Sequence, residues 1–202
     1  MLDKYEQSEQ SEKAAGRLWY PSANEYCKKV SEEFEVPIEL VGAVVSLLSP
    51  RNKWGRNKQD AKALISAVKH RQCFSSFSVC TFTSNKQKAW DLAEGVIKKS
   101  LPINPSFVFK GPKTRAFFEN ITNLNSPCVT IDTWAVRAAR EVELRWRSGL
   151  TLKQYKGLEK EYQEVARHVG EAPMNLQATV WLTVKRQTEE QEKKDKLETI
   201  VV

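Results

Sequence analysis

The sequence predicts an all-α fold. Between about residues 22 and 188, apolar residues recur with the 3.6-residue period of amphipathic helices. No segment shows the clear apolar–polar alternation of a strand, and prolines and glycines separate runs of helical length. These observations predict roughly eight helices. With 202 residues, the chain is long enough for one well-buried domain or for two lobes that share a cleft.

The N-terminal part of the chain begins with a polar segment and leads into the expected core. Residues 1–16 are rich in Ser, Glu, Gln and Lys, a composition that predicts a loose tail. A helix over 22–34 follows, with Ser22 as its N-cap. Pro37 suits the first position of the next helix, 38–48. That helix is apolar on nearly every side, so we expect it to be the central buried helix.

The next segments carry two further helices. Pro50 ends the buried helix, and 51–55 is predicted to be a loop. The helical period returns over 56–70. Residues 71–84 are rich in Ser, Thr, Phe and Cys, and their sequence leaves a loop and a short strand pair both open. A helix is then predicted over 86–100.

A turn and a hairpin separate this helix from the next pair. Pro102 and Pro105 bracket the turn, and a hairpin is predicted at about 104–114. A short helix follows over 114–121. Asp132 is of a residue type that commonly caps helices, and the helix that it starts is expected to run to about Leu144.

The C-terminal part is predicted to contain two helices and a charged end. Residues 152–169 are amphipathic, and Gly170 is expected to stop that helix. Pro173 opens the last helix, which leads into the charged segment 189–202. We therefore expect one helical domain over 17–188 between a flexible N-terminal tail and a charged C-terminal tail.

Charge and composition narrow the classes of function. The formal net charge is +7 and the pI is about 9.2, a surplus that suits a polyanionic partner, although a solvated basic surface is the alternative. The four cysteines include no C-x-x-C pair and no disulfide spacing, so we expect neither a metal site nor disulfides, and a reducing compartment. No run of eighteen apolar residues and no apolar signal core occur, which indicates no membrane association and a cytoplasmic or nucleoid-associated protein.

One lysine and one aspartate lie in contexts that suit catalysis on a sugar. Lys113 follows Gly111 and Pro112 at the start of a predicted helix, and Asp132 comes nineteen positions later. A helix start, together with partial burial, would lower the pKa of the Lys113 amine toward a nucleophilic value. A carboxylate can stabilise the positive charge that develops on a sugar under attack. The alternatives are a surface lysine that contacts phosphate and an aspartate that only caps a helix.

Four segments occur in the order found in the helix-hairpin-helix (HhH-GPD) DNA glycosylase superfamily, which includes 8-oxoguanine DNA glycosylase and endonuclease III. The hairpin with Lys113 resembles the family's Gly-x-Lys segment, and Ile131-Asp132-Thr133 its Val-Asp-Thr segment. The other two segments are 47–58, similar to a DNA-contacting Leu-Ser-x-Gln/Asn…Asn-Lys stretch, and 177–187, similar to a base-pocket helix. The hairpin keeps one glycine, Gly111, and has Phe109 where the family usually has another. The resemblance implies a two-lobed helical fold.

The resemblance gives the basic loop after the buried helix a role in binding DNA. Arg51 matches the slot of a side chain that fills the gap left by a flipped base. The other residues expected to bind DNA would contact its phosphates. They are Asn52, Lys53, Arg56 and Lys58 after the buried helix, and Lys110 and Gly111 in the hairpin. A solvated charged surface is the alternative for this loop. Trp54, within it, is expected to be a core anchor that pins the loop.

The last helix and the residue four positions after Lys113 are the candidates for a base pocket. Gln177 can present an amide to the edge of an extruded base, and Trp181 lies on the same helix face and could stack on it. Phe117 could supply the opposite wall. For both aromatic residues the alternative is helix packing in the core.

The function implied by the resemblance is a DNA glycosylase with AP-lyase activity. Lys113 would attack C1′ of the sugar and form a Schiff base, and Asp132 would stabilise the cationic sugar. The substrate would be duplex DNA with a modified base, with an oxidised purine such as 8-oxoguanine indicated by the Gln177 helix. No metal or cofactor is needed, and we expect a monomer. The alternatives are a DNA base hypermodification enzyme on the same fold and a non-catalytic helix-hairpin-helix DNA-binding protein.

Overall fold

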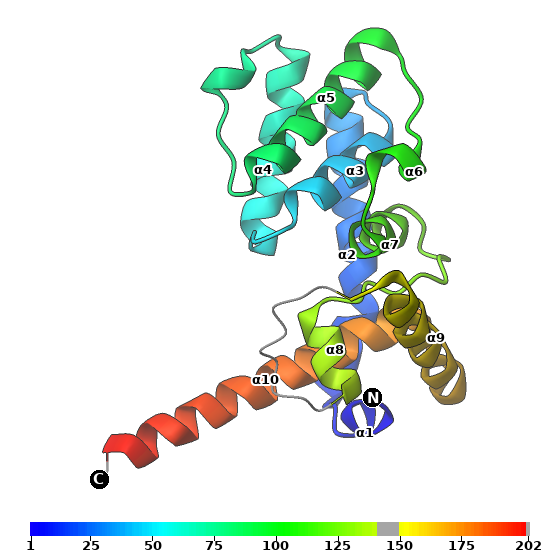
Figure 1. The fold of residues 1–202 in the computed structure, drawn as a ribbon, viewed down its shortest axis with the longest axis vertical. Helices are drawn as coiled ribbons and strands as arrows, with labels where there is room; N and C mark the ends of the chain where they lie inside the picture. The colour runs from blue at the N-terminus through cyan, green and yellow to red at the C-terminus, as the bar shows by residue number, and fades with distance from the viewer. Residues whose placement is uncertain (141–149, 201–202) are drawn as a thin grey trace. The chain divides into compact units, whose positions relative to one another are not determined.

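A computed structural model of the protein describes residues 1–140 and 150–200, and all regular elements within these ranges are helices (Figure 1). This confirms the all-α prediction. The elements are α1 (Leu2–Glu6), α2 (Gln10–Phe34), α3 (Ile38–Leu48), α4 (Trp54–Lys69), η1 (Phe74–Ser76), α5 (Thr83–Lys99), α6 (Pro105–Val108), α7 (Pro112–Thr122), α8 (Thr133–Arg140), α9 (Leu152–Val169) and α10 (Pro173–Ile200).

The chain divides into two compact units. Unit 1 combines the two ends of the chain, Met1–Pro21 and Asn125–Val202, and unit 2 is the continuous segment Ser22–Leu124. Helix α2 contributes its first part to unit 1 and the rest to unit 2. Pro21 lies inside this helix, at the division. Because proline has no backbone N–H, the helical hydrogen-bond ladder lacks one donor there.

Unit 2 is organised around α3, as the sequence predicted. Nine consecutive residues of this helix, Leu40–Leu48, are buried, and α4, α5 and α7 pack against it. A helix that is apolar on nearly every side can be packed against neighbours on all of its faces. Segment 71–84, for which the sequence left a loop and a strand pair open, contains the short helix η1 and the start of α5.

Unit 1 is organised around α10, against which α1, α8 and α9 pack. Helix α9 has the predicted bounds, with a capping box at Thr151 and with Gly170 in the left-handed conformation (φ 70°) at its C-terminus. Helix α8 begins after Asp132 as expected, whereas its predicted end near Leu144 lies outside the described residues. Helix α10 continues to Ile200, through most of the expected charged tail, where the side chains of 189–196 are exposed.

The first sixteen residues are mostly helical, contrary to the loose tail that we expected. Polar side chains in this segment have hydrogen-bond partners on α10. Thr183 donates from its hydroxyl to Ser8 (2.7 Å), and Arg186 donates from Nε to Glu12 (2.9 Å). Tyr5 is also buried. The N-terminal segment is therefore packed against α10 through contacts that its own polar composition does not predict.

A close backbone approach joins the start of α2 to α10. A Cβ atom added to Gly16 would lie 2.1 Å from Oγ1 of Thr179 and 2.7 Å from its backbone nitrogen. No side chain fits at these distances, so the crossing of the two helices requires glycine at this position.

Candidate nucleic-acid interface

The predicted hairpin is formed by α6, a short connection and α7. Asn104 caps α6 by accepting a hydrogen bond from the backbone N–H of Ser106 (3.0 Å). Phe109, which stands where the resembling family has a glycine, is buried, and its ring centroid lies 5.0 Å from that of Phe118 on α7. Aromatic packing between Phe109 and Phe118 therefore fixes this connection to α7.

The residues proposed to meet DNA at this hairpin are accessible. Lys110, Gly111 and Lys113 are all exposed. Gly111 is the N-cap of α7, and its φ of −101° suits any residue. A Cβ at Gly111 would meet nothing within 4 Å. Lys113 is in the first turn of α7, so the helix start is as predicted but the expected partial burial of its side chain is absent.

Asp132 caps α8, as the residue type predicted. Its Oδ1 accepts a hydrogen bond from the backbone N–H of Ala135 at 2.8 Å. Burial, and after it the nearby Asp132 carboxylate, raises the pKa of Tyr162 above its usual range. The hydroxyl of Tyr162 donates to the carbonyl of Ala135 (2.8 Å), so the first turn of α8 is fixed to α9. The carboxylate is half-exposed, and its position is well defined by the cap.

The basic loop between α3 and α4 is organised by a buried acid that the sequence analysis did not single out. Asp60 of α4 accepts hydrogen bonds from Asn52 Nδ2 (2.9 Å), Arg56 Nε (2.9 Å) and the backbone N–H of Cys80 (3.0 Å). The four-residue spacing between Arg56 and Asp60 was a signal for this pair. The positive charge of Arg56 is therefore partly neutralised by Asp60. Lys53, in contrast, is exposed and makes no ion pair within the described ranges.

Arg51 and Trp54 have different environments within this loop. Arg51 is exposed, adopts a left-handed backbone conformation (φ 58°), and its guanidinium lies over the ring of Phe82 at 4.9 Å. Trp54 is half-buried and makes edge contacts with Tyr26 and Phe117, with centroid distances of 6.3 and 6.5 Å. This agrees with the core-anchor interpretation of Trp54.

The amine of Lys58 lies over two aromatic rings of this cluster. Its Nζ is 5.6 Å from the centroid of Trp54 and 5.7 Å from that of Tyr26. The stem of this side chain is thus half-buried against the rings. Phe117 is buried, so its contact with Trp54 favours the packing alternative over a wall that stacks on a base.

The two residues proposed for the base edge and stacking lie on α10. Gln177 is buried, and its Oε1 accepts a hydrogen bond from the hydroxyl of Tyr20 at 2.8 Å. Trp181 is half-buried, with Nζ of Lys185 5.5 Å from its ring centroid. The acceptor half of the Gln177 amide is therefore already engaged by Tyr20, a partner distant in sequence.

The predicted site residues fall into two groups. Arg51, Lys58, Lys113 and Phe117, with the rest of the basic loop and hairpin, belong to unit 2. Asp132, Gln177 and Trp181 belong to unit 1. Within unit 2 the structure brings together Phe117, Trp54 and Lys58.

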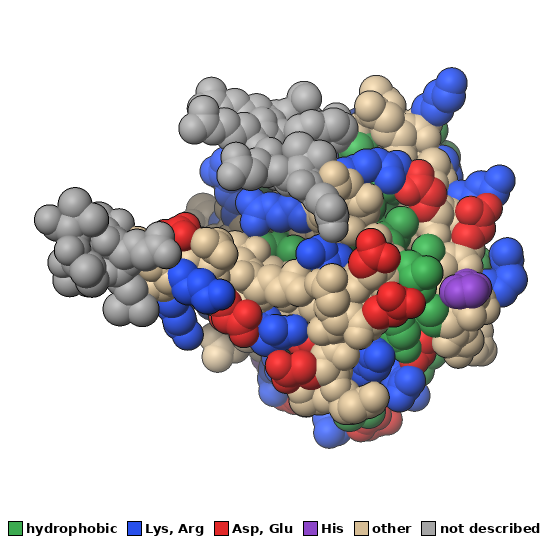
Figure 2. Space-filling view, turned by 90° about the horizontal axis from the view of Figure 1, so that it is seen from below, with side chains coloured by type: hydrophobic (Ala, Val, Ile, Leu, Met, Phe, Trp, Pro, Cys, Tyr) green, Lys and Arg blue, Asp and Glu red, His purple; other side chains and the backbone are tan. Residues whose placement is uncertain are grey.

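The face drawn in Figure 2 carries charges of both signs, with Lys and Arg side chains interspersed with Asp and Glu side chains. Within the described residues, no group of three or more His, Cys, Asp or Glu side chains is arranged to hold a metal ion. Among the same residues, no helix has the length and apolarity needed to cross a membrane.

These features define an all-helical protein of two compact units with an exposed basic loop and hairpin in one of them. Residues 1–188 match the model of a family described as "Family of unknown function (DUF7178)", and the chain belongs to this family. No curated protein and no solved structure matches the chain.

Proposed function

We propose that this protein binds duplex DNA and excises a modified base through a Schiff base formed by Lys113. The observation that carries the proposal is the position of Lys113: it is exposed in the first turn of α7, directly after a hairpin whose Gly111 has open space beside it. Gly111 has no side chain to obstruct a nucleic-acid backbone at this point, and a helix start favours a phosphate close to the Lys113 amine.

The proposed reaction begins with attack of the neutral Lys113 amine on C1′. The bond from C1′ to the base breaks, its electron pair leaves with the base, and the base takes up a proton. Loss of the amine proton and opening of the sugar give an imine, which permits β-elimination of the 3′ phosphate. In this proposal the Asp132 carboxylate stabilises the cationic sugar, and the α8 cap restricts its orientation. Gln177 and Trp181 would contact the extruded base.

A second candidate is a non-catalytic DNA-binding protein that uses the same hairpin. The exposure of Lys113 favours it, because a well-hydrated amine is suited to phosphate contact. The two candidates predict the same salt-dependent affinity for DNA and differ in covalent chemistry.

Borohydride reduction with a panel of lesion-bearing duplexes tests the choice. We expect a covalent adduct with at least one lesion, its loss in Lys113→Gln, and its retention in Lys110→Gln, which changes a neighbouring exposed lysine. DNA affinity should be similar in the two variants. An adduct that persists in Lys113→Gln would assign the nucleophile elsewhere, and binding without an adduct for the whole panel would support the non-catalytic candidate.

A further inference from the structure

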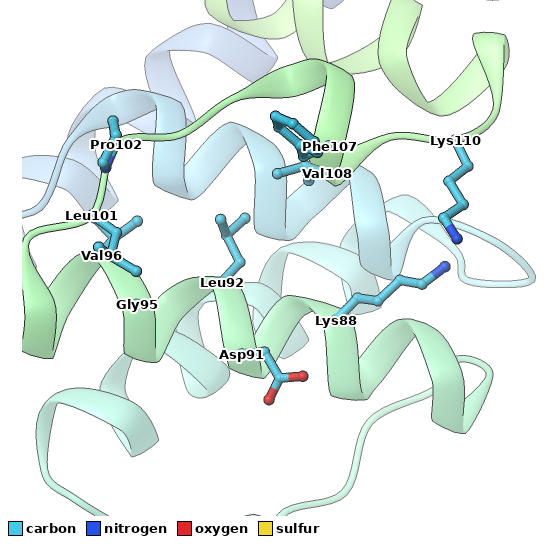
Figure 3. A pocket seen from close by; sticks show the side chains of 10 residues that line it. All are labelled: Lys88, Asp91, Leu92, Gly95, Val96, Leu101, Pro102, Phe107, Val108 and Lys110. Atoms are coloured by element: carbon cyan, nitrogen blue, oxygen red, sulfur yellow. The ribbon is translucent and has the colours of Figure 1, made fainter.

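A pocket in unit 2 lies between α5, the turn that follows it and the first part of the hairpin (Figure 3). Its volume is about 360 Å³, within the range of small-molecule sites. The residues that line it are Lys88, Asp91, Leu92, Gly95, Val96, Leu101, Pro102, Phe107, Val108 and Lys110. None of the residues that we propose for catalysis or for the base pocket is among them.

The walls of the pocket expose large apolar side chains. Phe107 is 84% exposed and Leu101 is 52% exposed, the first on α6 and the second just after α5. Gly95 lets the Leu101 side chain lie close to α5, since an added Cβ would be 3.3 Å from its Cδ1. Exposed apolar side chains grouped in a concavity are a mark of a binding surface. The ring of Phe107 is accessible to a flat ligand.

Two lysines at one end of the pocket complement this apolar wall. Lys88 and Lys110 point toward one another in Figure 3. Neither makes an ion pair in the described part of the chain. The acid in the lining, Asp91, accepts a hydrogen bond from Gln87 at 2.7 Å and points away from both amines. An anionic group placed between the two amines would receive charge-assisted hydrogen bonds from both.

We propose that this pocket binds one unpaired nucleotide of a DNA strand. Its phosphate would lie between Lys88 and Lys110, and its base would stack on Phe107. The inference rests on DNA being the partner under the proposed function, but it is independent of the chemistry of Lys113. An aromatic ring beside a pair of cations is the combination with which proteins hold single strands, since every base has a face to stack and every nucleotide a charge.

Fluorescence anisotropy with labelled tetrathymidylate tests this proposal. Phe107→Ala should weaken binding by roughly 5- to 140-fold, the range typical for removing the aromatic partner of one stacked base. The double change Lys88→Gln and Lys110→Gln should reduce the slope of log affinity against log salt by about 0.7, the value for one phosphate of a single strand. Two changes outside the pocket, Leu124→Ala and Lys99→Gln, are matched controls and should leave binding unchanged.

Three results would overturn the proposal. The first is wild-type affinity in Phe107→Ala. The second is an unchanged salt slope in the double variant Lys88→Gln and Lys110→Gln, which would remove the phosphate from between these lysines. The third is tighter binding of a leucine-containing acidic peptide of equal charge, which would indicate a protein partner.

The same variants separate this proposal from the proposed function. If Lys113→Gln loses borohydride trapping and Phe107→Ala weakens tetrathymidylate binding, both proposals stand. If wild type gives no adduct with any lesion but Phe107→Ala weakens strand binding, the excision chemistry fails and the pocket remains. Normal trapping together with unchanged strand binding in Phe107→Ala removes the pocket alone.

Discussion

Replacing Asp132 can separate its structural role from its proposed catalytic role. The cap needs an oxygen that accepts from the Ala135 N–H, and asparagine supplies one without the charge. Asp132→Asn should therefore change the free energy of unfolding by less than about 1 kcal/mol. Asp132→Ala removes the cap and should cost about 1 kcal/mol, equivalent to a melting temperature lower by about 2–4 °C. If the carboxylate stabilises the sugar cation, both variants should lower the rate by roughly 10²–10³-fold.

The assay is single-turnover borohydride trapping on a reactive lesion, with the melting temperature of each variant measured in the same buffer. Thr151→Ala is the matched control, because it removes the cap of α9 in the same unit, where the hydroxyl accepts from the Gln154 N–H at 3.3 Å. It should lose similar stability and keep the wild-type rate. A wild-type rate in Asp132→Asn would refute the electrostatic role and leave Asp132 as a helix cap.

The remaining predictions concern packing, acid stability and DNA affinity. Gly16→Ala forces a Cβ against the backbone of α10, so we expect a loss of about 3 kcal/mol and a melting temperature lower by roughly 6–12 °C; a change below about 2 °C would contradict the close approach. Burial opposes ionisation of Glu12, but the hydrogen bond from its arginine partner and further hydrogen bonds lower its pKa overall. The ionised Glu12 carboxylate thus makes its full contribution to stability above its ordinary pKa of 4.5, and this contribution disappears as the pH falls through the lowered pKa. The difference in the free energy of unfolding between wild type and Glu12→Gln, measured by urea titration, should therefore shrink as the pH is lowered. Replacing Lys53 and Lys58 by Ala should reduce the slope of log duplex affinity against log salt by about 0.9 for each phosphate that is no longer neutralised. Lys28→Ala, which changes another exposed lysine, is the control and should keep the wild-type slope. If the Lys53 and Lys58 variant has the same slope as this control, the loop is not part of the interface.

Local sequence signals were sufficient for most of the helices. Pro37, Gly170 and Pro173 act on the backbone of their own neighbourhood, and the helices that they delimit lie where the sequence placed them. Asp132 could likewise be identified as a cap, because capping depends on a residue three positions away.

Features that depend on distant partners could not be predicted in this way. Ser8 and Glu12 lie in a segment whose polar composition is typical of a disordered tail. Their burial depends on Thr183 and Arg186, which lie more than 170 positions later. For the same reason, the sequence did not reveal the hydrogen bond between Gln177 and Tyr20 in the candidate site. Sequence can supply the residue types of a site, whereas long-range contacts determine which of their polar atoms are already engaged.

The division of the chain has a consequence for the order in which it folds during synthesis. Unit 2 is one uninterrupted segment, so all its residues have been made once Leu124 is added. Unit 1 needs both ends of the chain, and α1 and the start of α2 must wait for α10 before Tyr5 and Ser8 can be buried. Contacts between residues close in sequence form sooner than those that close a long loop. We therefore expect a nascent chain in which unit 2 is folded while the N-terminal residues of unit 1 are still exposed, and in which synthesis of α10 allows unit 1 to fold.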